Sequence, residues 1–147
     1  MKSLVVYKKS ISSNINIVGD VVEEILKCII TVCGDVDECT RFELKVILNE
    51  ILINAVKHGN IGDESKNINI KAYFSRQNVL NISVKDEGSG YNFRKTCSCR
   101  KPYGEADGIS NMDESGRGIL ILKGLCDNIE LNRKGNKIVV TKSITRI

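Results

Sequence analysis

The segment NEILINAVKHGN, residues 49–60, spaces three polar side chains at intervals of four residues: Glu50, Asn54 and His58. A carboxylate such as that of Glu50 can accept a proton from a hydroxyl group or a water molecule. An amide oxygen one helical turn away can ligate a hard cation such as Mg²⁺, which prefers oxygen donors. The spacing therefore allows a general base beside a metal ligand. A helix with one solvated face remains the simpler interpretation of this segment taken alone.

A second candidate site is the segment DEGSG, Asp86–Gly90, which follows an alternating apolar stretch typical of a strand. Glycines at 88 and 90 would let a flat ligand lie close to the backbone. The carboxylate of Asp86 would then be available to accept a hydrogen bond from an amino group. By itself the pattern D-x-G-x-G is explained more simply by an ordinary turn.

The third candidate is SGRGI, Ser115–Ile119, where two glycines flank Arg117 at the start of a predicted helix. Backbone N–H groups at a helix N-terminus form an anion site, and glycine allows a phosphate to approach them. Arg117 adds a positive charge for a phosphate or for an acidic partner. The alternative is a loop end broken by glycine. The sequence has no G-x-x-x-x-G-K-[ST] motif, which excludes a P-loop.

A helix must position the first of these motifs. At 100° per residue, Glu43, Asn54 and Lys57 fall within about 40° of Glu50, whereas His58 lies about 80° away. Apolar residues border this narrow polar stripe on both sides. The pattern predicts a helix that is buried on most of its surface and presents Glu50 and Asn54 together.

The remaining elements follow from hydrophobic periodicity and turn signals. We expect helices at 18–32, 37–58 and 118–126, and strands at 3–7, 67–74, 79–87, 128–133 and 136–144. Between 88 and 116 periodicity vanishes, and a loop of that length is usually a functional lid or disordered. The order predicts an α/β two-layer sandwich in which helices cover one face of a mostly antiparallel sheet.

Composition limits the class of protein. The 147 residues predict a single domain, 1–147, and the formal net charge of +4 is mild. Basic residues are scattered and aromatic residues few, so we expect no direct nucleic-acid binding. No apolar run approaches the roughly 18 residues that a membrane helix needs. The first ten residues lack the features of a signal peptide, so we expect a cytoplasmic protein with no membrane contact.

The chain has six cysteines and one histidine, His58, but no C-x-x-C pair. A zinc site normally uses paired ligands in short loops, so zinc binding is not expected. Cys97 and Cys99 lie in a polar segment and are either redox or metal accessories or, as we favour, incidental loop cysteines. In a reducing cytosol most of the six would be free thiols.

The three motifs, in this order and with a long loop before the last, resemble the asparagine box and the two glycine boxes of the GHKL (histidine kinase-like) ATPase superfamily. The form E-x-x-x-N-A-x-x-H-G, starting at Glu50, and the small size are most similar to the stand-alone anti-sigma factor serine/threonine kinases. The resemblance covers nearly the whole chain. It implies an ATP-binding fold with an ATP lid at about 91–115.

The resemblance also implies roles for single residues. Glu50 matches the general base and Asn54 the Mg²⁺ ligand, whereas His58 would be structural. Asp86 matches the carboxylate that binds the adenine amino group, with Gly88 and Gly90 leaving room for the base. The amides that hold the phosphates match the lid-end residues Ser115, Gly116, Arg117 and Gly118.

This sequence departs from the family at two places. Many relatives carry threonine after the glycine of the last hairpin, where Asn136 follows Gly135; asparagine can still bond to the adenine through a water molecule. The lid segment FRKTCSCRKPYGEADG, residues 93–108, matches no known motif.

By resemblance, the chain is an anti-sigma factor that binds ATP with Mg²⁺ and phosphorylates a serine or threonine of an anti-sigma-factor antagonist protein. Its other partner would be a sigma factor, and the active form a homodimer. Two alternatives stay open: an ATP-gated anti-sigma binding module with little or no kinase activity, and an ATPase or detached histidine-kinase catalytic domain.

Overall fold

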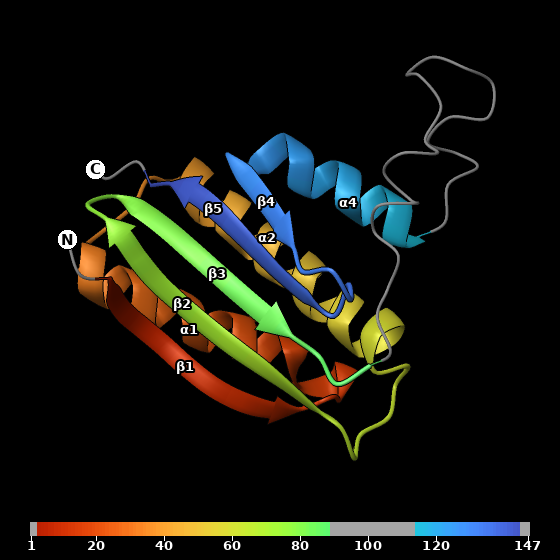
Figure 1. Cartoon of the computed structure of the whole chain (residues 1–147). Helices are drawn as coiled ribbons and strands as arrows, with labels where there is room; N and C mark the ends of the chain where they lie inside the picture. Colours follow the sequence, from red (N-terminus) through yellow and green to blue (C-terminus); the bar gives the residue numbers. More distant parts are fainter. Residues whose placement is uncertain (1–2, 89–113, 145–147) are drawn as a thin grey trace, which may run out of the picture.

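The computed structural model describes residues 3–88 and 114–144, and the element order is the predicted one (Figure 1). Strand β1 spans Leu4–Ser12, and a 3-10 turn, η1 (Ile15–Ile17), leads into helix α1 (Val18–Cys33). The remaining elements are α2 (Glu38–Asn54), a π-helical turn η2 (Ala55–Gly59), β2 (Asn67–Arg76), β3 (Val79–Lys85), α4 (Glu114–Leu125), β4 (Asn128–Leu131) and β5 (Lys137–Ser143).

The five strands form one antiparallel sheet in the order β1-β2-β3-β5-β4. Helices α1, α2 and α4 lie on the same face of this sheet (Figure 1). The predicted α/β two-layer sandwich is therefore confirmed. Because β3 and β5 are neighbours, the C-terminal end of β3 lies beside the start of β5, and Asp86 lies next to Asn136.

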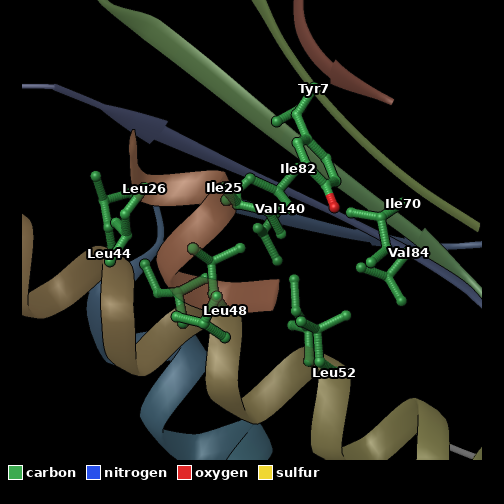
Figure 2. Close-up of a cluster of buried hydrophobic side chains, with 14 of the residues drawn as sticks. Tyr7, Ile25, Leu26, Leu44, Leu48, Leu52, Ile70, Ile82, Val84 and Val140 are labelled. Atoms are coloured by element: carbon green, nitrogen blue, oxygen red, sulfur yellow. The ribbon is translucent and has the colours of Figure 1, made fainter. Parts of the chain in front are cut away.

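The core fills the space between the helices and the sheet. Alternate residues of each central strand point at the helices, as the period of two requires, and meet apolar stripes of α1 and α2 (Figure 2). Each such side chain contributes about 1.5–3 kcal/mol when fully buried. Among the most buried are Ile25, Leu26, Leu44, Leu48, Leu52, Ile70, Ile82, Val84 and Val140.

Helix α2 has a defined start and an unusual end. The Asp37 carboxylate accepts a hydrogen bond of 2.6 Å from the backbone N–H of Thr40, and this cap holds the pKa of Asp37 below its ordinary value. At the other end, the N–H of Asn60 bonds to the carbonyl of Ala55 at 2.9 Å, five residues back. The predicted helix 37–58 is therefore an α-helix to Asn54 followed by a π turn, a feature frequent at functional sites.

Other element boundaries differ from the prediction. Strand β1 continues to Ser12 because it pairs with β2 as far as Ser12–Asn67, although the polar run Lys8-Lys9-Ser10 conceals its alternation. Helix α4 begins at Glu114, before the glycines rather than after them. Strand β4 is only four residues long, shorter than the predicted 128–133.

Candidate functional site

A pocket opens between the end of α2 and the adjoining ends of β3 and β5. Its volume is about 320 Å³, counting the space open to solvent. The pocket brings together Asn54 of the first motif and Asp86 of the second, which the sequence singled out separately. The lining residues are Ile51, Asn54, Ala55, Gly59, Val84, Asp86, Asn136, Lys137 and Ile138.

Asn54 is the last residue of α2, where the helix changes from α to π geometry. Its side chain is buried at 6% exposure, and its amide nitrogen Nδ2 has no hydrogen-bond partner among the described residues. A buried polar group without a partner is costly. Since amide oxygen and nitrogen exchange places when the group rotates by 180°, the side chain can offer a ligand a donor or an acceptor. This amide fits a role in ligand binding.

Glu50, one turn before Asn54, faces the start of helix α4. A β-carbon built on Gly118 of α4 would stand 2.5 Å from the carboxylate oxygen Oε2 of Glu50 and 3.4 Å from Nδ2 of Asn54. A side chain at this position would therefore require the Glu50 carboxylate to move, whereas Asn54 would be in ordinary contact. The motif Ser115–Ile119 therefore contacts the first motif directly, through the backbone of Gly118 and the carboxylate of Glu50.

Asp86 follows β3 and is buried at 8% exposure. Its carboxylate oxygen Oδ1 accepts a hydrogen bond of 2.8 Å from the backbone N–H of Gly88. Burial raises the pKa of the Asp86 carboxyl, while the Gly88 hydrogen bond and the positive charges of Lys134 and Lys66 oppose that rise. The second carboxylate oxygen, Oδ2, lies close to Gly59 at the wall of the pocket.

Two glycines let the first and second motifs touch. A β-carbon on Gly59 would overlap the carboxylate of Asp86, and one on Gly88 would overlap the carbonyl oxygen of Gly59. The contact made by Gly88 is thus with the end of the π turn. Room for a base at this residue stays a prediction.

Two buried asparagines at the site were not among the site residues proposed from the sequence, although the resemblance put Asn136 near the adenine. Asn60, 1% exposed, accepts a hydrogen bond of 2.8 Å from the N–H of Glu87 and donates one of 3.1 Å to the carbonyl of Asn67. Asn136, 7% exposed, lines the pocket beside Asp86. Their sequence signal was slight: each directly follows a glycine, at a position where asparagine is common in any turn.

The other predicted site residues are only partly described. Gly90 and most of the predicted lid lie outside the described residues. Ser115, Gly116 and Arg117 fall in the first turns of α4, where the structure describes the backbone course alone. His58 is half-buried in the π turn and is not among the residues that line the pocket.

Four of the six cysteines lie within the described residues. Cys28, Cys39 and Cys126 are free thiols, and the thiol of Cys33 donates to the carbonyl of Gly34 at 3.3 Å, whereas Cys97 and Cys99 lie outside the described residues. Within 3–88 and 114–144, no three His, Cys, Asp or Glu side chains are grouped to hold a metal ion. Nor does any helix of these two ranges have the length and apolarity to cross a membrane.

Comparison with known proteins places these features in a family context. A family model described as "Histidine kinase-like ATPase domain" matches residues 14–142. In structure, a histidine kinase domain from a blue-light activated histidine kinase of Erythrobacter litoralis aligns with a TM-score of 0.48 and 18% identity, over 86% of this chain and 60% of that chain.

Several curated relatives bear the name serine-protein kinase RsbW. The protein of Oceanobacillus iheyensis is 28% identical over 103 residues, which cover 69% of this chain and 65% of the relative. Those of Bacillus pumilus and Bacillus subtilis are each 26% identical, over 71% and 68% of this chain and over 65% and 62% of their own lengths. The chain thus spans a little less than two thirds of the length of these relatives.

Proposed function

Because the chain belongs to the histidine kinase-like ATPase domain family, we propose that it binds ATP with Mg²⁺ and transfers the terminal phosphoryl group to a serine or threonine of a partner protein. The observation that carries the proposal is that Asn54 and Asp86 line the same pocket. The buried carboxylate of Asp86 suits the amino group of a purine. The buried amide of Asn54, close to Gly118 of α4, suits the phosphates of the same nucleotide.

Asp86 recognises the base in this proposal. The carboxylate accepts a hydrogen bond from the exocyclic amino group of adenine, while Gly88 holds the other carboxylate oxygen in place. Apolar residues of the pocket, Ile51, Val84 and Ile138, contact the faces of the ring. A base with a carbonyl oxygen in place of the amino group would present an acceptor to an acceptor and would bind poorly.

Asn54 and the start of α4 hold the phosphates. The Asn54 side chain fits a Mg²⁺ ligand because it lies buried at the pocket and carries an amide oxygen, the kind of donor that Mg²⁺ prefers. Its amide nitrogen, which has no partner among the described residues, could donate to a phosphate oxygen. When bound, Mg²⁺ neutralises charge on the phosphate oxygens. Gly118 contributes a backbone approach unobstructed by a side chain, and Gly116 and Arg117 precede it.

Glu50 orients the acceptor hydroxyl and takes its proton as the new oxygen–phosphorus bond forms. The bond between the terminal phosphorus and the β,γ-bridging oxygen breaks in the same transfer, and ADP leaves with that oxygen. Its carboxylate stands directly beside Gly118, at the phosphate end of the site. General-base assistance of this kind contributes roughly 10²–10⁴-fold to the rate. Glu50 is thus the catalytic residue, and Asn54 and Asp86 bind the nucleotide.

The partners of the proposed reaction follow the family resemblance of the sequence. The phosphorylated protein would be an anti-sigma-factor antagonist, and the chain would also bind a sigma factor, act as a homodimer and work in the cytoplasm. The curated relatives support the kinase part through the name serine-protein kinase.

The decisive experiment compares wild type with Glu50→Gln in the presence of radiolabelled ATP, Mg²⁺ and purified candidate antagonist proteins. We expect Glu50→Gln to bind ATP with unchanged affinity and to transfer phosphate at least about 100-fold more slowly. Glu38→Gln, at an exposed glutamate in the first turn of the same helix, is the matched control and should behave as wild type.

Three results would change the proposal. Undiminished transfer by Glu50→Gln would remove Glu50 from the chemistry. ATP-dependent partner binding without any transfer by wild type would identify a binding module instead of a kinase. Acid-labile label on a partner histidine would identify a histidine-kinase catalytic domain.

A further inference from the structure

The turn that connects β4 to β5 is held together by one side chain, that of Asn132. The carbonyl oxygen of the Asn132 side chain accepts three backbone N–H bonds, from Gly135 at 2.8 Å, Asn136 at 3.0 Å and Lys137 at 3.1 Å. Gly135 has φ of +83°, a conformation that favours glycine. The backbone N–H of Asn136 is therefore engaged within its own turn.

That engagement interrupts the ladder between β5 and β3. Residues Lys85 and Lys137 are paired, so Asp86 lies opposite Asn136 at the next step. A hydrogen-bonded antiparallel pair normally exchanges two backbone bonds. Here the N–H of Asp86 bonds to the carbonyl of Asn136 at 2.9 Å, but the return bond is missing because Asn132 has taken the donor.

The side chain of Asn136 replaces the missing donor. Its Nδ2 donates to the carbonyl of Asp86 at 3.3 Å, and its Oδ1 accepts from Nδ2 of Asn132 at 2.6 Å. Both ends of this buried amide are engaged, which fixes its orientation. The backbone of Asp86 is thus held by Asn136 through both its N–H and its carbonyl.

The next peptide is held from the opposite side. The N–H of Glu87 donates to the Asn60 side chain at 2.8 Å, and the N–H of Gly88 donates to the Asp86 carboxylate at 2.8 Å. Asn60 and Asn136 therefore fix the backbone on both sides of a short turn. The direction of the Asp86 carboxylate follows from that backbone.

We infer that Asn136 is a positioning residue for base recognition: its side-chain amide, locked by Asn132, completes the interrupted ladder and fixes the carboxylate of Asp86, which sets the preference for a purine that carries an amino group. The inference rests on the proposed nucleotide site. It goes further by assigning base selectivity to a residue that does not itself need to touch the base.

The test compares two ligands that differ only in that amino group: ATP with Mg²⁺, and purine riboside triphosphate with Mg²⁺. Dissociation constants are measured by calorimetry for wild type, Asn136→Ala and Asn136→Leu, the last of which keeps the volume without polar atoms. Asn128→Ala is the matched control, because Asn128 lies in the same hairpin and bonds to Glu130 at an exposed position instead of to Asp86.

We expect wild type and Asn128→Ala to prefer ATP about 10- to 100-fold, the worth of one hydrogen bond to a charged group. Both Asn136 variants should lower this ratio to below about threefold, mainly by weakening ATP binding, since only ATP uses the oriented carboxylate. A merely structural role would weaken both ligands alike and leave the ratio unchanged.

The outcomes are distinguishable. If both Asn136 variants keep the wild-type ratio, or lower both affinities equally, Asn136 is not a positioning residue. If wild type binds neither triphosphate, the proposed function itself is overturned. Circular dichroism melting of each variant shows whether it is folded, and Asn136→Leu provides the answer if Asn136→Ala is not.

Discussion

The α-carbon of Gly118 lies so near Glu50 that a single methyl group on it would stand 2.5 Å from the Glu50 carboxylate. Helix α4 and helix α2 therefore meet at the two residues to which the proposal assigns phosphate approach and proton transfer. Because this contact is limited by steric overlap, adding one carbon atom at residue 118 tests it.

Gly118→Ala should uncouple activity from stability. The added methyl group meets the far end of a flexible side chain, so Glu50 can move aside and the fold should survive. The displaced carboxylate would no longer face the acceptor hydroxyl, and a misplacement of about 1 Å can cost 10²-fold in rate. We expect phosphate transfer to fall at least about tenfold, measured with labelled ATP.

The control for this substitution lies in the same helix. Gly124 has no atom within 4 Å of a built β-carbon. Gly124→Ala should therefore raise the free energy of unfolding by about 0.4–1 kcal/mol, through the lower entropy of the unfolded chain, and leave transfer unchanged. Equal loss of activity in both variants would contradict the proposed contact.

Gly88→Ala should destabilise the protein and abolish nucleotide binding together. Its methyl group would overlap the carbonyl oxygen of Gly59, which is backbone and cannot rotate away. We expect a loss of about 1–3 kcal/mol in urea unfolding, typical of overpacking. Gly19→Ala in α1, where a β-carbon meets nothing within 4 Å, should be neutral or slightly stabilising.

Asp86→Asn should separate stability from binding through its dependence on pH. Burial raises the pKa of Asp86 above 3.8, so this carboxyl adds stability below about pH 3.8 and that contribution is lost as pH rises through the raised pKa. At pH 7 Asp86→Asn should therefore be more stable than wild type in urea, and near pH 3 equal to it. ATP should nevertheless bind about 10- to 100-fold more weakly at pH 7.

For the exposed Asp63, stability should depend on pH in the opposite direction. Bonds from the hydroxyl and the N–H of Ser65 hold the pKa of Asp63 below 3.8. That carboxylate adds stability above pH 3.8, and the contribution is lost as pH falls through the lowered pKa. Asp63→Asn should thus lower stability at pH 7 and leave ATP affinity unchanged. The same sign for both variants would refute the assigned burial of Asp86.

Lys142→Met should cost more than a typical surface substitution. The Lys142 ammonium is 2.5 Å from the Glu43 carboxylate and donates to the carbonyl of Leu125 at 2.7 Å, which ties β5 to α2 and to the end of α4. Its side chain is only 12% exposed. Since removal leaves both acceptors partly buried and unpaired, we expect a loss of about 1–3 kcal/mol in urea unfolding.

Lys45→Met tests whether partial burial is the cause. Lys45 pairs with Glu23 at 3.1 Å, but the two side chains are 54% and 47% exposed. An exposed pair contributes about 0–1 kcal/mol. A loss as large as that of Lys142→Met would mean that burial does not distinguish the two pairs.

Periodicity predicted the helices and the order of the elements well. The apolar pattern of residues 18–32 gave α1 to within one residue, because the helix buries one continuous stripe. Strand β1 was predicted too short because Lys8-Lys9-Ser10 breaks the alternation on an edge strand. Its last residues are held by pairing with β2, and no single-strand pattern expresses that pairing.

The sequence predicted which residue types make up the candidate site, but not which of these residues are in contact. Asn54 and Asp86 stood out by residue type and spacing, whereas the contact between Gly59 and Asp86 depends on the π turn, which has no side-chain period. The bonds of Asn136 depend on the register between β3 and β5 and on the competing acceptor Asn132. Only the folded chain displays those relationships.

The π turn Ala55–Gly59 has a consequence for comparing relatives by alignment. It accommodates one residue more per turn than an α-helix would, and that residue sets where Gly59 meets Asp86. The number of residues from Asn54 to Gly59 therefore determines how the first motif contacts the second, although the two motifs lie far apart in the chain. A homologue with one residue fewer in this interval must join the motifs by a different contact, however similar the motifs themselves remain.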